Sequence, residues 1–317
     1  MDIQNIKQRT ARCLSGATYS PRRLALLHTG IALAGSLVLM IVSYLLSRQM
    51  AGTGGLAGIG TRTALQSVQT VLSMGLTLAT PFWELGFLAA VMDYARQQPT
   101  TPKGLLRGFQ RIGPLLRLML LQGLIYGLIL FAAMQLASTV VMLTPFGGGL
   151  LQLIQNLSES EQFLQTGVVP EAMLVPLMKA ALPMYVVSMV LFVAAIVPVS
   201  YRLRLARYIL LDQERPRALV ALVASNRAMK GNCVAFFKLD LSFWWYWLLQ
   251  VVCSVVGIGD VLLDLLGVQL PIDADVAMFV FFGLQLVFTL VITWIWRAPV
   301  ETAYAIAYDT LTAKPKE

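Results

Sequence analysis

One carboxylate, Glu84, lies well inside an apolar stretch of the sequence, three residues after Pro81. An unpaired charge inside a bilayer costs about 2.5–3.5 kcal/mol on insertion scales, so an ionisable residue there indicates a functional site or a compensating partner. Arg117 is the expected ion-pair partner, and Gln122, Gln250 and Gln285 are the expected hydrogen-bond partners. These residues form a candidate intramembrane polar site. The alternative is a protonated or hydrogen-bonded glutamate that holds helices together.

Four further carboxylates, Asp260, Asp264, Asp273 and Asp275, lie at one end of an apolar segment and beyond a short turn. Oxygen ligands of this kind bind hard cations such as Ca²⁺. Acids at the end of a helix are equally well satisfied by solvent, however. The sequence therefore predicts no metal site here.

The motifs of ordinary enzymes do not occur: there is no phosphate-binding Gly-x-x-x-x-Gly-Lys, no zinc-ligand spacing and no nucleophile elbow. The run Gly257-Ile258-Gly259-Asp260 matches the Gly-x-Gly-Asp pattern of intramembrane aspartyl proteases, which need a second nearby Asp to share a proton. The Tyr308-Asp309 pair falls on the opposite side of the expected membrane. We therefore expect no enzyme and no cofactor.

A basic amphipathic stretch offers a different kind of site. Arg217, Arg227 and Lys230 flank apolar residues at helical spacing, and Gly231 follows as a turn residue. Such charges attract anionic head groups, each contributing about 1 kcal/mol near a membrane surface. The three residues are candidates for lipid or partner docking, and the alternative is a purely structural elbow.

The composition indicates the solvent in which these residues lie. Of 317 residues, 57% are hydrophobic and 13% charged, and the mean hydropathy is +0.72. Soluble domains carry roughly 25% charged residues, so lipid is the expected solvent. The hydrophobicity excludes a disordered chain, and the wide spacing of Cys13, Cys233 and Cys253 excludes a disulfide scaffold.

A spanning helix needs about 20 mostly apolar residues, and six segments meet this requirement. They are residues 24–46, 68–92, 112–143, 184–205, 241–266 and 276–296. Between them we expect amphipathic elbows at about 100–111 and 216–238 and a helix on the opposite surface at about 150–165. The sequence thus predicts an all-α polytopic protein with six transmembrane helices in a single membrane domain, residues 1–317.

The basic residues predict its orientation. All but three of the 24 lysines and arginines, the exceptions being Arg48, Arg62 and Lys179, fall on the side that holds both termini. An excess of Lys and Arg marks cytoplasmic segments, so both termini are expected in the cytoplasm. The net charge of +8 is then a topological signal, and we expect no nucleic-acid partner.

Several motifs around the second elbow resemble a known family. They are Arg207-Tyr208-Ile209-Leu210-Leu211-Asp212, Pro216, Ser225-Asn226-Arg227-Ala228-Met229-Lys230-Gly231-Asn232, Phe236-Phe237-Lys238-Leu239 and Leu241-Ser242-Phe243. Looser matches include Pro81, Gly86 and Tyr308. Together these resemble the bacterial integral membrane proteins called domain of unknown function 975, although Cys233 departs from the pattern. The resemblance implies a multi-span protein of the bacterial cytoplasmic (inner) membrane and implies no activity.

Two functional expectations follow. The first is a structural membrane component that binds lipid or a membrane protein partner. The second is a transporter or channel for a small solute or ion that uses Glu84 within the helix bundle. A water-filled route to Glu84 distinguishes the second from the first.

Overall fold

The computed structural model describes residues 2–52, 56–160, 171–215, 217–265, 268 and 271–312, and every regular element in these ranges is a helix. The chain, expected as one membrane domain, divides into two compact units. Unit 1 comprises residues 1–115, 205–217 and 234–317, and unit 2 comprises residues 116–204 and 218–233.

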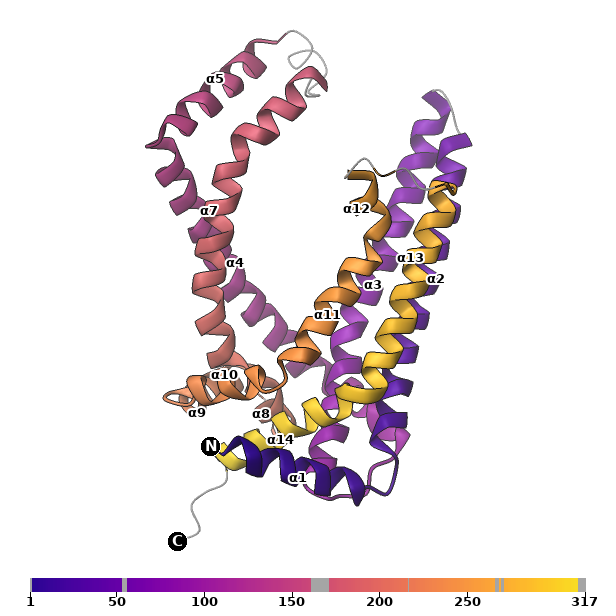
Figure 1. Cartoon of the computed structure of the whole chain (residues 1–317), viewed down its shortest axis with the longest axis vertical. Helices are drawn as coiled ribbons and strands as arrows, with labels where there is room; N and C mark the ends of the chain where they lie inside the picture. The colour runs from indigo at the N-terminus through magenta and orange to yellow at the C-terminus, as the bar shows by residue number, and fades with distance from the viewer. Residues whose placement is uncertain are drawn as a thin grey trace. The chain divides into compact units, whose positions relative to one another are not determined.

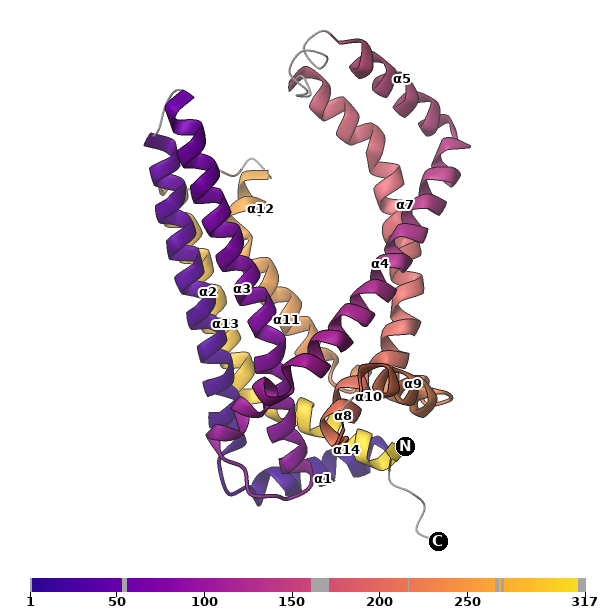
Figure 2. The same ribbon diagram turned by 180° about the vertical axis from the view of Figure 1, so that it is seen from behind.

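Unit 1 contains three long, mostly apolar helices that run side by side, with several shorter helices gathered at the end that holds α1 and α14 (Figures 1 and 2). Its elements are α1 (Ile3–Ser15), α2 (Pro21–Gly52), α3 (Leu56–Ala95), the 3₁₀ helix η1 (Pro102–Arg111), α8 (Ala206–Asp212), most of α10 (Cys233–Leu241), α11 (Trp244–Gly257), α12 (Gly259–Leu265), α13 (Ala274–Ile292), the π-helical turn η2 (Thr293–Arg297) and α14 (Ala298–Thr312). The long helices are α2, α3 and α13. Helices α11 and α13 also pack against each other.

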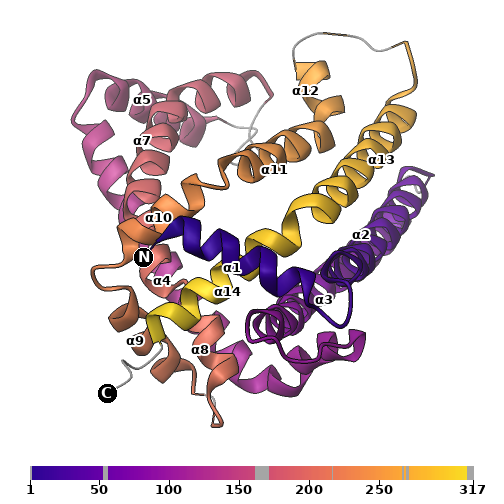
Figure 3. The same cartoon turned by 60° about the horizontal axis from the view of Figure 1, so that its bottom comes forward.

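A layer of short helices, here called the base layer, is formed by α1, η1, α8 and α14. Figure 3 shows α1 lying across α14 within this layer. Helix α14 is the most thoroughly buried of these elements, because its small alanines allow close packing and favour the helix. Helix α1 buries Ile6, Thr10 and Cys13. Its Lys7 ammonium donates to the carbonyl oxygen of Ser242 at 3.2 Å.

Two glycines bring η1 into backbone contact with α3. A Cβ atom on Gly86 of α3 would overlap the main-chain carbonyl of Leu105, and one on Gly108 of η1 would overlap that of Phe82. Leu105 is buried in this contact. The elbow predicted at residues 100–111 is therefore the 3₁₀ helix at Pro102–Arg111, held directly on α3.

Unit 2 contains most of α4 (Ile112–Met142), α5 (Pro145–Glu159), α7 (Glu171–Leu203) and α9 (Ala218–Met229). Helices α5 and α7 pack together. The Ser225 hydroxyl of α9 donates to the carbonyl oxygen of Arg202 at 2.8 Å, which ties α9 to the end of α7. Gly231 has a φ of +83°, so it provides the turn after α9 that the sequence predicted. The helix expected at 150–165 begins earlier, at Pro145; residues 161–165 lie outside the described residues.

Among the described residues, five helices are long and apolar enough to cross a membrane, and a sixth span is obtained if the bent pair α10 and α11 counts as one. These two helices meet at 67°. This bend lies at Ser242 and Phe243, at the very start of the segment predicted as a span at 241–266. A second break at Ile258 separates α11 from α12.

Candidate functional site

Glu84 of α3 forms an ion pair with Arg297, the last residue of η2. The Arg297 Nη2 atom lies 2.9 Å from the Glu84 Oε1 atom. The same guanidinium donates through Nη1 to the Thr29 hydroxyl of α2 at 2.8 Å. Charge-assisted bonds of this kind are among the strongest in proteins. The pair therefore joins three elements, α2, α3 and η2, at one point.

Aromatic rings and a buried histidine surround this ion pair. The Arg297 guanidinium lies over the Phe87 ring at 5.0 Å from its centroid. His28 of α2 packs against the rings of Trp83 and Phe87, with centroids 5.6 and 4.7 Å away. The Trp83 indole N–H donates to the His28 carbonyl oxygen at 2.9 Å. The ion pair thus lies in an aromatic setting of low polarity, where an unpaired charge is costly.

The His28 side chain is the one polar group of this site without a hydrogen-bond partner among the described residues. The residue is 1% exposed, and neither ring nitrogen has a partner. Buried polar atoms are normally hydrogen-bonded, so an orphaned imidazole requires an explanation. Stacking on Trp83 provides packing but satisfies neither nitrogen. The sequence placed His28 at the start of a span, but it did not predict the contact of this side chain with Trp83 and Phe87.

The ion-pair partner differs from the one expected from the sequence. Arg117 belongs to unit 2, and the structure gives Glu84 the partner Arg297 instead. Arg297 ends η2, which continues α13 directly into α14, and α14 packs against α3. The role of Arg117 and of Gln122, also in unit 2, stays a prediction.

The two glutamines of unit 1 lie in the contact between α11 and α13. The Gln285 side chain of α13 packs against Gly257, where a Cβ atom would overlap its amide. The Cys253 thiol of α11 contacts the Gln285 carbonyl oxygen at 3.5 Å and the Thr289 hydroxyl at 3.1 Å. Gln250 is half-buried in α11. For Gln285 the structure thus gives contacts with α11, and its link to Glu84 stays a prediction.

A second charged cluster, which sequence reasoning missed, connects the base layer. We call it the base-layer ion network; it comprises Asp93, Arg96, Arg107, Asp212 and Asp309. Arg96 binds two carboxylates, with Nη1 2.7 Å from Asp212 and Nη2 2.8 Å from Asp309. Hydrogen bonds to these carboxylates raise the pKa of the Arg96 guanidinium above its usual value, which keeps it charged. Arg107 binds Asp93 at 2.6 Å.

The residues that carried the family resemblance meet at this network. The Tyr308 hydroxyl donates to Asp212 at 3.1 Å, and the Tyr308 ring stacks on that of Tyr208 with centroids 5.3 Å apart. Arg111 donates to the carbonyl oxygens of Leu210 and Gln213, at 2.6 and 2.8 Å. A polar cavity of about 280 Å³ lies beside Asp93 and Arg96. The sequence offered one signal for this contact: Asp212 and Tyr308, which lie 96 residues apart, both belong to the motifs that match the family.

The basic elbow residues are exposed. Arg217 follows α8 in unit 1, and Arg227 and Lys230 lie at the end of α9 in unit 2. None of the three pairs with a carboxylate in the part of the chain that the structure describes. Their charges are therefore available to an anionic surface. Whether a lipid or a protein uses them stays a prediction.

Two of the four aspartates expected on the other side of the membrane, Asp273 and Asp275, have hydrogen-bond partners in the structure. Asp275 accepts from the Tyr44 hydroxyl at 3.0 Å and lies 3.6 Å from Arg48. Asp273 caps α13 by accepting from the Asp275 backbone N–H. The side chain of Asp264 lies outside the described residues. In the described ranges no group of three or more His, Cys, Asp or Glu side chains could hold a metal ion.

These features define the class of protein. It is an all-α protein with five or six apolar helices of membrane-spanning length, an ion pair between α3 and η2 that is also hydrogen-bonded to α2, and a charged network in its base layer. The chain belongs to the family described as "Protein of unknown function (DUF975)", whose model matches residues 32–315. No curated protein and no solved structure matches it.

Proposed function

We propose that this protein is a non-catalytic, structural component of a bacterial cytoplasmic membrane, with both termini in the cytoplasm. It binds lipid and a membrane protein partner and does not transport a solute. The observation that carries this proposal is the ion pair between Glu84 and Arg297. A carboxylate neutralised by a guanidinium, which itself packs on the Phe87 ring, holds helices together, since its charge is already compensated.

The exposed apolar surface supports the membrane location. Helices α4, α7 and α13 carry many exposed large apolar side chains along their length. On a soluble protein such continuous apolar surfaces are rare, whereas lipid tails cover them without cost. The strong bias of basic residues towards the side of the termini supports the orientation.

Binding to anionic lipid head groups is the second part of the proposal. Arg217, Arg227 and Lys230 are exposed and have no carboxylate partner among the described residues. Each basic side chain near an anionic surface contributes about 1 kcal/mol. An Arg227→Ala, Lys230→Ala double variant is therefore expected to bind fewer anionic lipids on purification. Unchanged lipid content together with unchanged membrane insertion would remove this part.

One observation favours the alternative, a transporter or channel. Both His28 ring nitrogens are buried without a partner beside the ion pair, and a water or solute that reached them would satisfy them. Ionisable groups of this kind line many solute pathways. The two functions differ in one property that can be measured, which is access of water to the region around Glu84.

The test labels a cysteine one helical turn from Glu84. Leu88→Cys, in a background where Cys13, Cys233 and Cys253 are alanine, keeps the ion pair intact. Membrane vesicles of both orientations are treated with a membrane-impermeant maleimide. Gln97→Cys, which is exposed beyond α3, is the positive control, and Val71→Cys, on an exposed apolar face of α3, is the lipid-facing control.

The structural function predicts labelling of the Gln97→Cys variant from the cytoplasmic side alone and no labelling of the Leu88→Cys variant from either side. Labelling at position 88 from either side establishes an aqueous route and overturns the proposal in favour of transport. Labelling at position 97 from the outside overturns the proposed orientation.

A further inference from the structure

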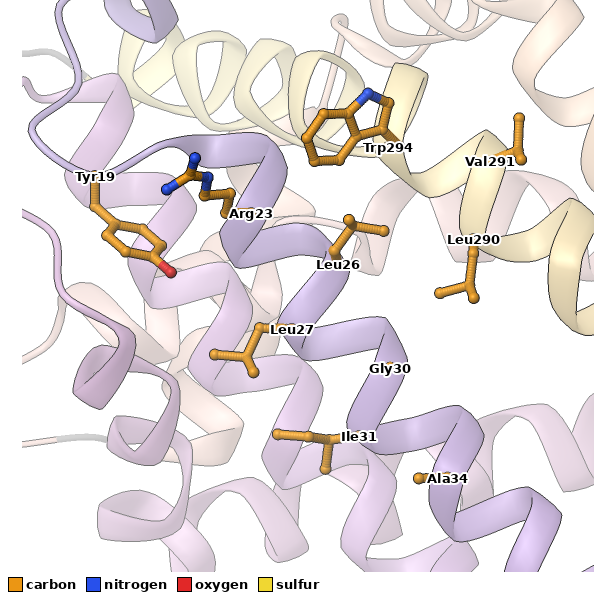
Figure 4. A pocket seen from close by; sticks show the side chains of 10 residues that line it. All are labelled: Tyr19, Arg23, Leu26, Leu27, Gly30, Ile31, Ala34, Leu290, Val291 and Trp294. Carbon is orange, nitrogen blue, oxygen red and sulfur yellow. The ribbon is translucent and has the colours of Figure 1, made fainter.

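An apolar groove runs along α2, at the end where this helix leaves α1. The groove has a volume of about 790 Å³ and is bounded by α2 on one side and by α13 and η2 on the other (Figure 4). Its walls include Leu27, Ile31, Leu290 and Trp294, which are between one third and one half exposed. Both walls belong to unit 1.

One charged side chain lies at the end of this groove. Arg23 lines it beside Tyr19, whereas the remaining lining residues are apolar (Figure 4). Arg23 is exposed and has no carboxylate partner in the described ranges. In contrast, Arg96, Arg107 and Arg297 of the same unit are each paired with a carboxylate.

The charge around Arg23 is strongly one-sided. No Asp or Glu occurs in the sequence between Asp2 and Glu84, whereas Arg9, Arg12 and Arg22 lie in the same stretch as Arg23. A guanidinium has five N–H donors in a planar fork, which matches the oxygens of a phosphodiester. The charge therefore favours an anion at this end of the groove.

The length of the groove fits one leaflet of a bilayer. From Arg23 to Ala34 the axis of α2 advances about 16 Å at 1.5 Å per residue, and the hydrocarbon core of a bilayer is about 30 Å thick. A lipid with its head group at Arg23 would thus lay its tails along the groove within one leaflet. Trp294 lies on the opposite wall, and tryptophan is enriched at the head-group level of membranes.

We infer that this groove binds a single anionic phospholipid of the cytoplasmic leaflet, with the phosphodiester on Arg23 and the tails between α2 and α13. The inference rests on the proposed membrane location, and the site is separate from Arg227 and Lys230 in unit 2. Lipid tails elsewhere in the bilayer are equally apolar, so preference for this position comes from the head group and from the shape of the groove.

The structure offers a position in the groove wall where a new side chain would start in open space. A Cβ atom on Gly30 would meet no atom within 4 Å, and Gly30 lines the groove. The Gly30→Phe variant therefore places a ring in the space for the tails. Gly75 of α3 is equally open, so Gly75→Phe is the matched control. Arg22→Gln is the charge control for Arg23→Gln, because Arg22 is exposed but does not line the groove.

The experiment is native mass spectrometry of the full-length protein, released from detergent with added phosphatidylglycerol or phosphatidylcholine. The wild-type protein is expected to keep one phosphatidylglycerol at least tenfold more than one phosphatidylcholine. Arg23→Gln is expected to abolish this preference, and Gly30→Phe to abolish the bound lipid, while the two control variants keep it. The Arg227→Ala, Lys230→Ala variant is expected to lose further phosphatidylglycerol molecules but to keep this most strongly retained one. Thermal melting of each variant verifies folding.

Three results would overturn the inference. Equal retention of the two lipids by the wild-type protein shows that no head group is recognised. Unchanged retention by both Arg23→Gln and Gly30→Phe places the lipid elsewhere. A dimer signal that Gly30→Phe removes in place of the lipid assigns the groove to a second copy of the chain. Maleimide labelling of the Leu88→Cys variant would overturn the proposed structural function, but it would not change the outcome of these lipid measurements.

Discussion

The Nη2 atom of Arg297 lies 2.9 Å from the Oε1 atom of Glu84, although the two residues are 213 positions apart in the sequence. This contact, with the bond from Arg297 to Thr29, joins the end of the last long helix to α2 and α3. The Arg297 side chain is 17% exposed and that of Glu84 is 40% exposed. The Arg297 guanidinium is therefore largely covered by protein, so the loss of its counter-charge is costly.

Replacement of Glu84 by Gln is expected to destabilise the protein by about 2 kcal/mol, because it leaves the Arg297 guanidinium without its counter-charge. Arg297→Gln is expected to have a similar effect. The double variant is expected to lose less than the sum of the two, since both charges are removed together. The measurement is thermal melting of the purified protein in detergent.

Glu159→Gln is the matched control for this series, because Glu159 lies at the exposed end of α5 and forms no ion pair among the described residues. Its melting temperature should equal that of the wild-type protein. Strictly additive effects of Glu84→Gln and Arg297→Gln would show that the pair does not contribute to stability as a unit.

Replacement of Arg96 by Ala is expected to destabilise unit 1 by roughly 2 kcal/mol, because Asp212 and Asp309 lose their shared charged donor. Arg96→Lys is expected to recover only part of the loss, since an ammonium does not reproduce the planar fork that reaches both carboxylates. Lys103→Ala, at an exposed position of η1, is the control and should change stability by less than about 0.5 kcal/mol. Full recovery by lysine would contradict the two-carboxylate geometry.

Substitution of Gly86 or Gly108 by Ala is expected to be disruptive, with a loss of about 3 kcal/mol, because each new methyl group overlaps the backbone of the opposite element. Gly75→Ala in the same helix has open space and should be neutral or stabilising by up to about 1 kcal/mol. Melting temperature and the rate of proteolysis at η1 report the effect. Equal behaviour of Gly75→Ala and Gly86→Ala would show that η1 does not pack directly on α3.

Gly231 is the described glycine with a positive φ, and an alanine there is expected to cost about 1 kcal/mol because L side chains are strained in that conformation. Gly113→Ala, where a Cβ atom meets no neighbour, is the control. Thermal melting checks the difference. If Gly231→Ala melts at the same temperature as the control, the turn after α9 is not held in the left-handed conformation.

Local patterns in the sequence were sufficient for the helices themselves. The apolar runs around α2, α3, α4, α7 and α13 predicted long helices, because hydrophobic length is a property of neighbouring residues. The turn at Gly231 was predicted from the glycine itself, whose conformational freedom is also a local property. The fifth span was predicted as one segment because hydropathy does not register the bend before Trp244 or the break at Ile258.

The tertiary structure alone decided which charges meet. Glu84 was recognised from the sequence as a carboxylate within an apolar segment, but its partner Arg297 and the pairing of Arg96 with Asp212 and Asp309 connect residues 116 to 213 positions apart. Hydropathy and charge counts describe each segment separately, whereas an ion pair depends on how helices turn and cross. The sequence thus determined a helical chain with apolar segments of membrane-spanning length and a carboxylate within one of them, and packing determined that this carboxylate pairs with Arg297.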